Sequence, residues 1–95
     1  MASSIEFRDF ILDQLSKLKY ITCKQMIGEY LLYLNGKLFG GIYDNRLLIK
    51  MTKSNKKYNL RAEIPYEKAK PMYLVDNVDD IDYLDKIVID TCIDL

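Results

Sequence analysis

The dipeptide Asn35-Gly36 is the feature that most constrains what this chain can fold into. It separates two segments with strand-like composition, residues 29–34 and 37–43. A two-residue type I′ turn needs positive φ at both central positions, and asparagine and glycine adopt that conformation most readily. We therefore predict a tight hairpin that joins two antiparallel strands.

Other segments extend this sheet. Gly28 interrupts a two-residue alternation of side chains, and Asp44-Asn45 predicts a second tight turn. Gly40-Gly41 leaves room for a bulge or for the close approach of another backbone. Residues 58–62 fit either a short irregular strand or a single turn. The remaining strands are expected at 21–27, 46–51 and 72–75.

Two prolines delimit a lysine-rich loop after the polar loop at 52–57. Pro65 opens this second loop and Pro71 closes it. Because proline has no N–H to donate to a ladder, Pro71 predicts that strand 72–75 lies at an edge of the sheet and not inside it.

Amphipathic helices are expected at both ends. Ser3 and Glu6 fit a capping box, and the apolar periodicity that follows predicts a helix to about Lys19. Asp79 is the expected N-cap of the second helix, with further aspartates in its first turn. The predicted buried stripes are Phe7, Phe10, Ile11, Leu15 and Leu18, then Ile81, Leu84, Ile87, Val88, Cys92 and Leu95.

This order of elements predicts one α+β domain over residues 1–95, with an antiparallel sheet of four to five strands and helices on one face. The sheet face without helices must then be covered by another part of the chain or a partner, or serve as a functional surface. Eight tyrosines are many for this length. Those in the strands either pack within the sheet or remain exposed as a partner surface, since tyrosine is enriched at interfaces.

The net charge is zero, from 14 basic and 14 acidic side chains, but it is unevenly distributed. Residues 45–70 carry eight basic and two acidic side chains, whereas residues 71–95 carry seven aspartates and one lysine. Two balanced solvated faces or a bipolar surface for partners would both fit. Nucleic-acid binding through the basic segment is disfavoured because the acidic segment would repel a polyanion.

Catalytic and metal-binding motifs are missing from the sequence. There is no histidine, and we find no nucleotide-binding loop, nucleophile elbow or CxxC pair. The aspartates 79, 80, 82 and 85 lack the glycine and glutamate of a calcium loop and fit an acidic helix start. We expect no enzyme activity, no metal and no cofactor.

The location of the chain is predicted to be cytoplasmic. No apolar run approaches the roughly 18–20 residues that cross a bilayer, and the amino terminus lacks a signal-peptide core. Cys23 and Cys92 are therefore expected as buried thiols. A disulfide between them would require the first strand and the last helix to meet.

Three stretches carry a family resemblance: residues 24–37, Leu48-Ile49-Lys50, and residues 64–72 with Ala69-Lys70-Pro71-Met72. Together they resemble the signatures of the TfoX/Sxy amino-terminal domain family, although Ile27 stands where that family has phenylalanine. The motif residues, which are our candidate interaction residues, are Lys24, Met26, Gly28, Glu29, Tyr30, Tyr33, Gly36, Lys37, Lys50, Lys70, Pro71 and Met72.

The resemblance implies an α+β fold similar to the secretion-chaperone-like class, and a link to transcription control of natural competence in bacteria. It implies no catalytic residue. Full-length regulators of this family add a carboxy-terminal helical domain, so we expect a stand-alone, single-domain member.

Three functional hypotheses follow. The favoured one is a non-enzymatic cytoplasmic module that binds a protein partner or itself through the exposed sheet face or an edge strand. The second is a nucleic-acid-contacting protein that uses Lys53, Lys56, Lys57 and Arg61, with Lys50, Lys68 and Lys70 beside them. The third is a small-ligand binder or enzyme, which requires a pocket with convergent polar groups.

The predicted hairpin can be tested by replacing Gly36 with valine. A β-branched residue resists positive φ, so Gly36→Val should lower the melting temperature. An unchanged melting temperature in thermal denaturation would show that the turn lies elsewhere.

Overall fold

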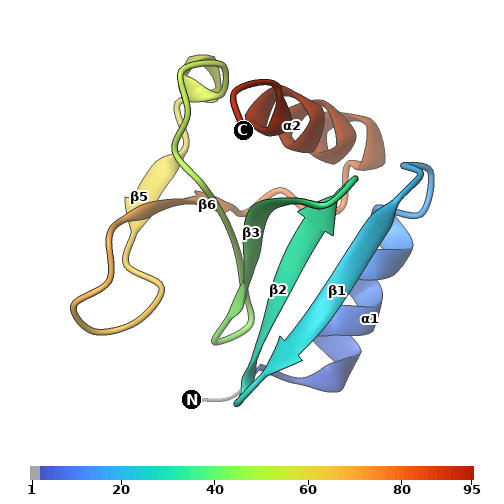
Figure 1. The fold of residues 1–95 in the computed structure, drawn as a ribbon, viewed down its shortest axis with the longest axis vertical. Coiled ribbons are helices and arrows are strands. Elements are labelled where there is room, and N and C mark those ends of the chain that lie inside the picture. The colour runs from blue at the N-terminus through green and yellow to red at the C-terminus, as the bar shows by residue number, and fades with distance from the viewer. Residues whose placement is uncertain (1–2) are drawn as a thin grey trace.

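The computed structural model describes residues 3–95, which form an N-terminal helix, a six-stranded antiparallel sheet and a C-terminal helix (Figure 1). This arrangement confirms the predicted α+β class, with one or two more strands than expected. The helices are α1 (Ile5–Gln14) and α2 (Ile81–Ile93). The strands are β1 (Ile21–Met26), β2 (Glu29–Leu34), β3 (Lys37–Tyr43), β4 (Arg46–Ile49), β5 (Arg61–Glu63) and β6 (Met72–Val75).

Strand order in the sheet is β1-β2-β3-β4-β6-β5, so the prediction that residues 72–75 form an edge strand is wrong. Pro71 precedes the first paired residue, Met72, which lies opposite Glu63. Its missing N–H therefore falls outside the ladder, and β6 can pair on both sides. This edge belongs instead to β5, which overlaps the end of the segment 58–62 that fitted either a strand or a turn. That segment starts at the last residue of a 3₁₀ turn, Lys56–Tyr58, and ends inside β5.

Both predicted tight turns are confirmed. Asn35 and Gly36 have φ of 51° and 80°, and Asp44 and Asn45 have φ of 52° and 56°. The β1–β2 connection is also a two-residue turn, in which Gly28 has φ of 74°. Ile27 lies in this turn and is fully exposed, so the prediction that the first strand includes Ile27 is wrong. The fourth strand likewise ends at Ile49, two residues before the predicted end.

A bulge shapes the centre of the sheet, as Gly40-Gly41 predicted. Leu32 pairs with Gly40 while Tyr33 pairs with Leu38, which leaves Phe39 as the extra residue. The Phe39 side chain is fully buried in the core. A Cβ atom on Gly40 would lie 2.2 Å from the backbone oxygen of Leu48, so only glycine allows the two strands to approach this closely.

The helix caps differ from the predictions by one residue. Ser4, not Ser3, caps α1, and its hydroxyl accepts from the N–H of Phe7 at 3.1 Å. The Ser3 hydroxyl instead accepts from the N–H of Asn45 at 3.0 Å, which ties the chain start to the β3–β4 turn. Asp80, not Asp79, caps α2. The first helix ends at Gln14, five residues before Lys19, because residues 15–17 continue as turns.

Both helices pack on one face of the sheet, as predicted. Ile11 and Leu15 from the first amphipathic segment and Leu84, Ile87 and Val88 from α2 share one core cluster with the strands. Two predicted stripe residues, Phe10 and Leu95, are exposed. The core members from the strands are Tyr30, Leu32, Phe39, Ile42, Leu47, Ile49 and Val75.

The segment after β4 is fastened to α2. Asn55 is fully buried, and its side-chain amide donates to the Thr91 hydroxyl at 2.9 Å and to the Lys50 carbonyl at 2.8 Å. The Tyr58 hydroxyl donates to the Asp90 carboxylate. Burial, followed by this bond to Asp90, raises the pKa of Tyr58 to about 12. Within residues 3–95, no helix is long and apolar enough to cross a membrane.

The close approach at Gly40 predicts that alanine at this position lowers the free energy of unfolding more than alanine at another glycine position. Gly40→Ala should destabilise the fold by about 2–3 kcal/mol, because the new methyl group collides with backbone atoms. Gly36→Ala is the matched control: its Cβ meets nothing within 4 Å, so only the positive φ adds strain, at about 1–2 kcal/mol. Urea denaturation measures both. An equal loss in the two variants would contradict the close approach.

Candidate binding cleft

The sheet face without helices, called the open face here, carries a second set of apolar side chains. Cross-strand partners share a face, and Leu31, opposite Gly41, and Leu48, opposite Leu74, alternate with the core residues. Only Leu48 in this set is fully buried. The open face consists of Met26, Leu31, Tyr33, Leu38, Tyr43, Leu48, Met72 and Leu74.

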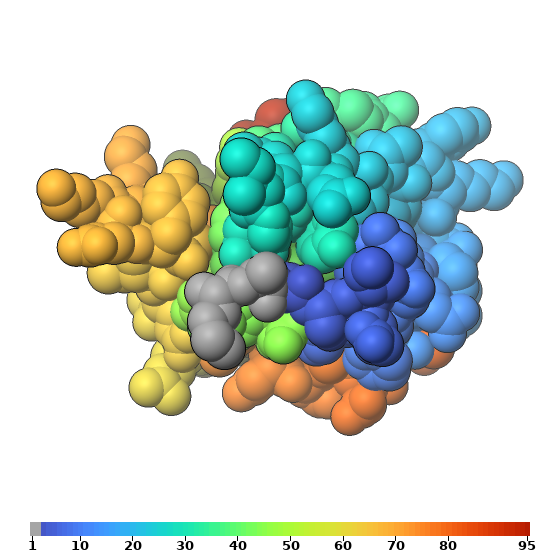
Figure 2. Space-filling view, turned by 90° about the horizontal axis from the view of Figure 1, so that it is seen from below, coloured from blue at the N-terminus to red at the C-terminus, as the bar shows by residue number. Residues whose placement is uncertain are grey.

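The loop between β5 and β6, residues 64–71, projects from the body as a lobe (Figures 1 and 2). Arg46 fastens its base. The guanidinium donates to the Glu63 carboxylate at 2.7 Å and to the carbonyls of Ile64 and Pro65 at 3.3 Å. A fourth bond reaches the carbonyl of Tyr43 at 3.1 Å. One side chain on β4 therefore holds the start of the loop and the end of β3 together.

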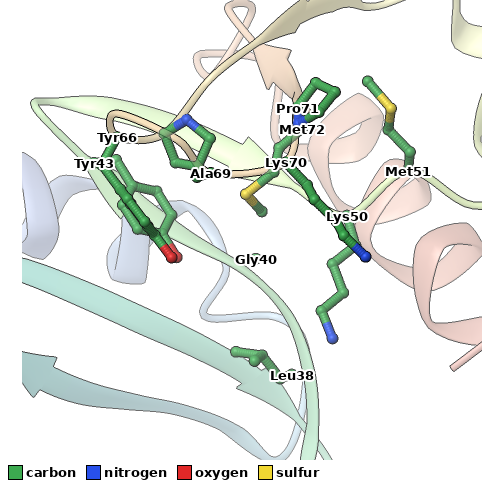
Figure 3. A pocket seen from close by; sticks show the side chains of 11 residues that line it. Leu38, Gly40, Tyr43, Lys50, Met51, Tyr66, Ala69, Lys70, Pro71 and Met72 are labelled. Atoms are coloured by element: carbon green, nitrogen blue, oxygen red, sulfur yellow. The ribbon is translucent and has the colours of Figure 1, made fainter.

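A cleft of about 620 Å³ lies between this loop and the open face (Figure 3). Its lining comes from β3, from the residues that follow β4, and from the loop as it leads into β6. Most of these side chains are apolar or aromatic, and lysine and tyrosine supply the ionisable groups. The cleft-lining residues are Leu38, Gly40, Tyr43, Lys50, Met51, Pro65, Tyr66, Ala69, Lys70, Pro71 and Met72.

Two tyrosines form one end of the cleft. The rings of Tyr43 and Tyr66 are tilted by 46° with their centroids 6.2 Å apart, which is a favourable aromatic arrangement. Burial, followed by the neighbouring Tyr66, raises the pKa of the Tyr43 phenol. The phenol therefore stays protonated at neutral pH and can both donate and accept a hydrogen bond.

Two lysines form the other end. The side chains of Lys50 and Lys70 extend away from the tyrosine pair (Figure 3). Among the described residues, no carboxylate lies within 4 Å of either ammonium group, and Glu63 at the loop base is paired with Arg46 and Arg61. The cleft thus combines an apolar body with two cationic groups that have no acidic partner.

Comparison with known proteins assigns the chain to a family. Residues 13–87 match the TfoX N-terminal domain family. The chain belongs to this family. It is also similar to an uncharacterised 12.7 kDa protein encoded in the trpE 5′ region of Spirochaeta aurantia, with 34% identity over 80 residues that cover 82% of this chain and 70% of the relative.

The structure brings some of the predicted TfoX motif residues together in the cleft. Lys50, Lys70, Pro71 and Met72, which come from two separate stretches, meet in the cleft. The lining is completed by residues that were not predicted as site residues: Leu38, Gly40, Tyr43, Met51, Pro65, Tyr66 and Ala69. Pro65, Tyr66 and Ala69 lie in the 64–72 stretch that carries the family resemblance, but no pattern in the sequence linked this stretch to the lining residues of β3.

The other motif residues lie away from the cleft and mainly shape the fold. Tyr30 is buried in the core under the guanidinium of Arg8, which lies 5.2 Å from the ring centroid. Glu29 accepts from the N–H of Asp44 at 3.2 Å, which ties two turns together. Gly28 and Gly36 occupy turns, Tyr33 belongs to the open face, and Lys24, Met26 and Lys37 are exposed.

The candidate nucleic-acid residues are distributed over several elements. Lys57 lies 3.1 Å from the Asp90 carboxylate and Arg61 lies 3.5 Å from that of Glu63. Lys53 and Lys56 are exposed, and Lys56 begins the 3₁₀ turn. Beside Lys53, the N–H of Ser54 donates to the Asp94 carboxylate at 2.8 Å. Acidic side chains are therefore interleaved with this basic segment.

The cysteines and the acidic helix start form no site in the described part of the chain. Cys92 is buried as predicted, whereas Cys23 is only half-buried. Both are free thiols, and burial raises the pKa of both, which disfavours an activated thiolate. No group of three or more His, Cys, Asp or Glu residues within 3–95 is arranged to hold a metal ion.

The role of Arg46 in holding the loop can be tested by hydrogen–deuterium exchange. Arg46→Met should reduce the protection of residues 64–71 and cost about 1–3 kcal/mol of stability, because charge-assisted bonds to the loop are lost. Arg61→Met is the matched control, since that side chain contacts the same Glu63 but is 79% exposed. It should change stability by less than about 0.5 kcal/mol. Equal exchange in both variants would refute the anchoring role.

Proposed function

We propose that this chain is a non-enzymatic binding domain that recognises a protein partner through the open face of its sheet. The observation that carries the proposal is the one-sided covering of the sheet. Both helices pack against one face, while Leu31 and Tyr33 on the other face are half-buried and lie outside the core cluster. Such a patch of apolar and aromatic side chains is typical of a protein-interaction surface.

The partner surface is proposed to be the β1–β2 part of the open face: Met26, Leu31 and Tyr33. Met26 is 50% exposed, which is costly for a large apolar side chain without a partner. Lys24 and Glu29 lie beside these residues on the same face and balance each other in charge. A largely apolar, electrically neutral surface favours a protein partner over a polyanion.

Two further observations support a binding role without catalysis. The ionisable side chains of the cleft are lysine and tyrosine, without a carboxylate or thiol to form an acid–base or nucleophile–base pair with them. The basic residues at 53–61 are interleaved with acidic ones, which weakens the alternative of nucleic-acid binding. That alternative would require binding that falls steeply with salt.

A role in the control of competence transcription, exerted by contact with a regulatory protein in the bacterial cytoplasm, is the finer form of this proposal. Its support is family membership. The binding role is supported by the open face, and the experiment below tests it independently of any role in competence.

The test compares wild type, Tyr33→Glu and Ile89→Glu, each as the whole chain. Each form is immobilised as bait to measure partner binding, and light scattering measures self-association. Tyr33→Glu places a charge at the centre of the partner surface and should weaken partner binding, or dimerisation if the partner is a second copy, by at least about tenfold. Ile89→Glu is the control, because Ile89 is also exposed, at 46%, but lies on α2. It should retain the partner.

The proposal requires one specific protein that wild type and Ile89→Glu retain and Tyr33→Glu loses. A partner that Ile89→Glu loses, or that all three forms retain equally, would contradict it. So would a monomer with no Tyr33-dependent partner at moderate salt.

A further inference from the structure

We propose that the cleft beneath the 64–71 loop is a separate binding site for a small organic anion with an aromatic or apolar body. This site goes beyond the proposed partner surface, because neither Met26, Leu31 nor Tyr33 lines the cleft. The domain would then carry two sites on one sheet face, one for a protein and one for a small molecule.

The size and the construction of the cleft fit a small molecule. Its volume of about 620 Å³ falls within the roughly 300–1,000 Å³ of small-molecule sites. Arg46 ties the loop base to the sheet with bonds of 2.7–3.3 Å, so the walls are in place before a ligand arrives. A preformed site reduces the entropy that binding has to offset.

The charge of the cleft selects an anion. Lys50 and Lys70 both line it, from segments 20 positions apart, and no acidic residue appears in the lining. Among the described residues, Glu63 at the loop base pairs with Arg46 at 2.7 Å, and Glu67 in the loop is outside the lining and forms no ion pair with either lysine within 4 Å. A carboxylate accepting from two ammonium groups would supply the missing charge, and charge-assisted bonds are stronger than neutral ones.

The rest of the lining selects an apolar body for that anion. Tyr43 and Tyr66 stand at the end opposite the lysines, and Met72 lies between the two ends (Figure 3). A planar ring fits beside the tilted tyrosine pair, while the anionic group reaches the lysines. Inorganic anions would leave this apolar surface unused. The ligand class is therefore an arylalkyl carboxylate or a compound of similar shape and charge.

The experiment is an NMR titration of the ¹⁵N-labelled whole chain with 3-phenylpropanoate. A probe of this size should bind with a Kd on the order of 1 mM. Its binding should shift the backbone signals of Gly40, Met51 and Ala69, three lining residues from separate segments. The neutral isostere 3-phenylpropanamide should bind at least about tenfold more weakly, and acetate, which lacks the ring, should cause no saturable shift.

Two lysine variants test the cationic end, and a third is their control. Lys50→Met and Lys70→Met keep the aliphatic stem and should each weaken 3-phenylpropanoate binding by about tenfold. Lys24→Met removes an exposed lysine outside the cleft and should leave the affinity unchanged. Lys50→Met should in turn retain the protein partner that Tyr33→Glu loses, because Lys50 lies outside the partner surface, and this result separates the two sites.

Several outcomes would overturn the inference. Equal binding of the acid and the amide would mean that the lysines do not select charge. Unchanged affinity in both lysine variants, with their melting temperatures retained, would place the ligand elsewhere. A saturable response to an acidic peptide but none to 3-phenylpropanoate would assign the cleft to a protein segment instead.

Discussion

The close approach of β3 and β4 at Gly40 is the constraint on which the rest of the structure depends. The backbone oxygen of Leu48 occupies the space where any other residue at position 40 would carry its Cβ, at 2.2 Å. The accompanying bulge places the Phe39 ring in the core and leaves the Phe39 carbonyl to accept from the N–H of Lys50 at 2.8 Å. The same local distortion thus fills the core under the helices and brings Lys50 to the cleft on the other side.

The second determinant is the unequal use of the two sheet faces. Both helices share one core cluster with one face, so the other face is left to the 64–71 loop and to solvent. Arg46 holds this loop by bonding its backbone carbonyls, a kind of contact that leaves the side chains of the loop free. Tyr66 and Lys70 can therefore line the cleft while Arg46 fixes the backbone that carries them. Structural and binding roles are thus divided among neighbouring residues.

Much of the fold could be predicted from local pattern. The bounds of β2, β3 and β6 and both tight turns follow from alternation and from turn residues such as Asn35 and Gly36. Two of the errors lie where a distant contact replaced a local preference. Ser3 was expected to cap α1, but its hydroxyl bonds to Asn45, 42 positions away. Strand 72–75 was expected at an edge, but β5 pairs with it because Pro71 stays outside the ladder.

For the site, the family resemblance named the motif residues Lys50, Lys70, Pro71 and Met72, whereas periodicity and the order of elements predicted that helices would cover one sheet face. Periodicity and turn chemistry act between neighbouring residues, which is why they are visible along the chain. Only the tertiary structure decided that Tyr43, Tyr66 and the two lysines line one cleft, and that Arg46 holds the base of the loop above it through Glu63 and two backbone carbonyls. The physical reason is that the 64–71 loop has no repeating pattern of its own. Its position depends on hydrogen bonds from a side chain some 20 residues earlier, which no local pattern records.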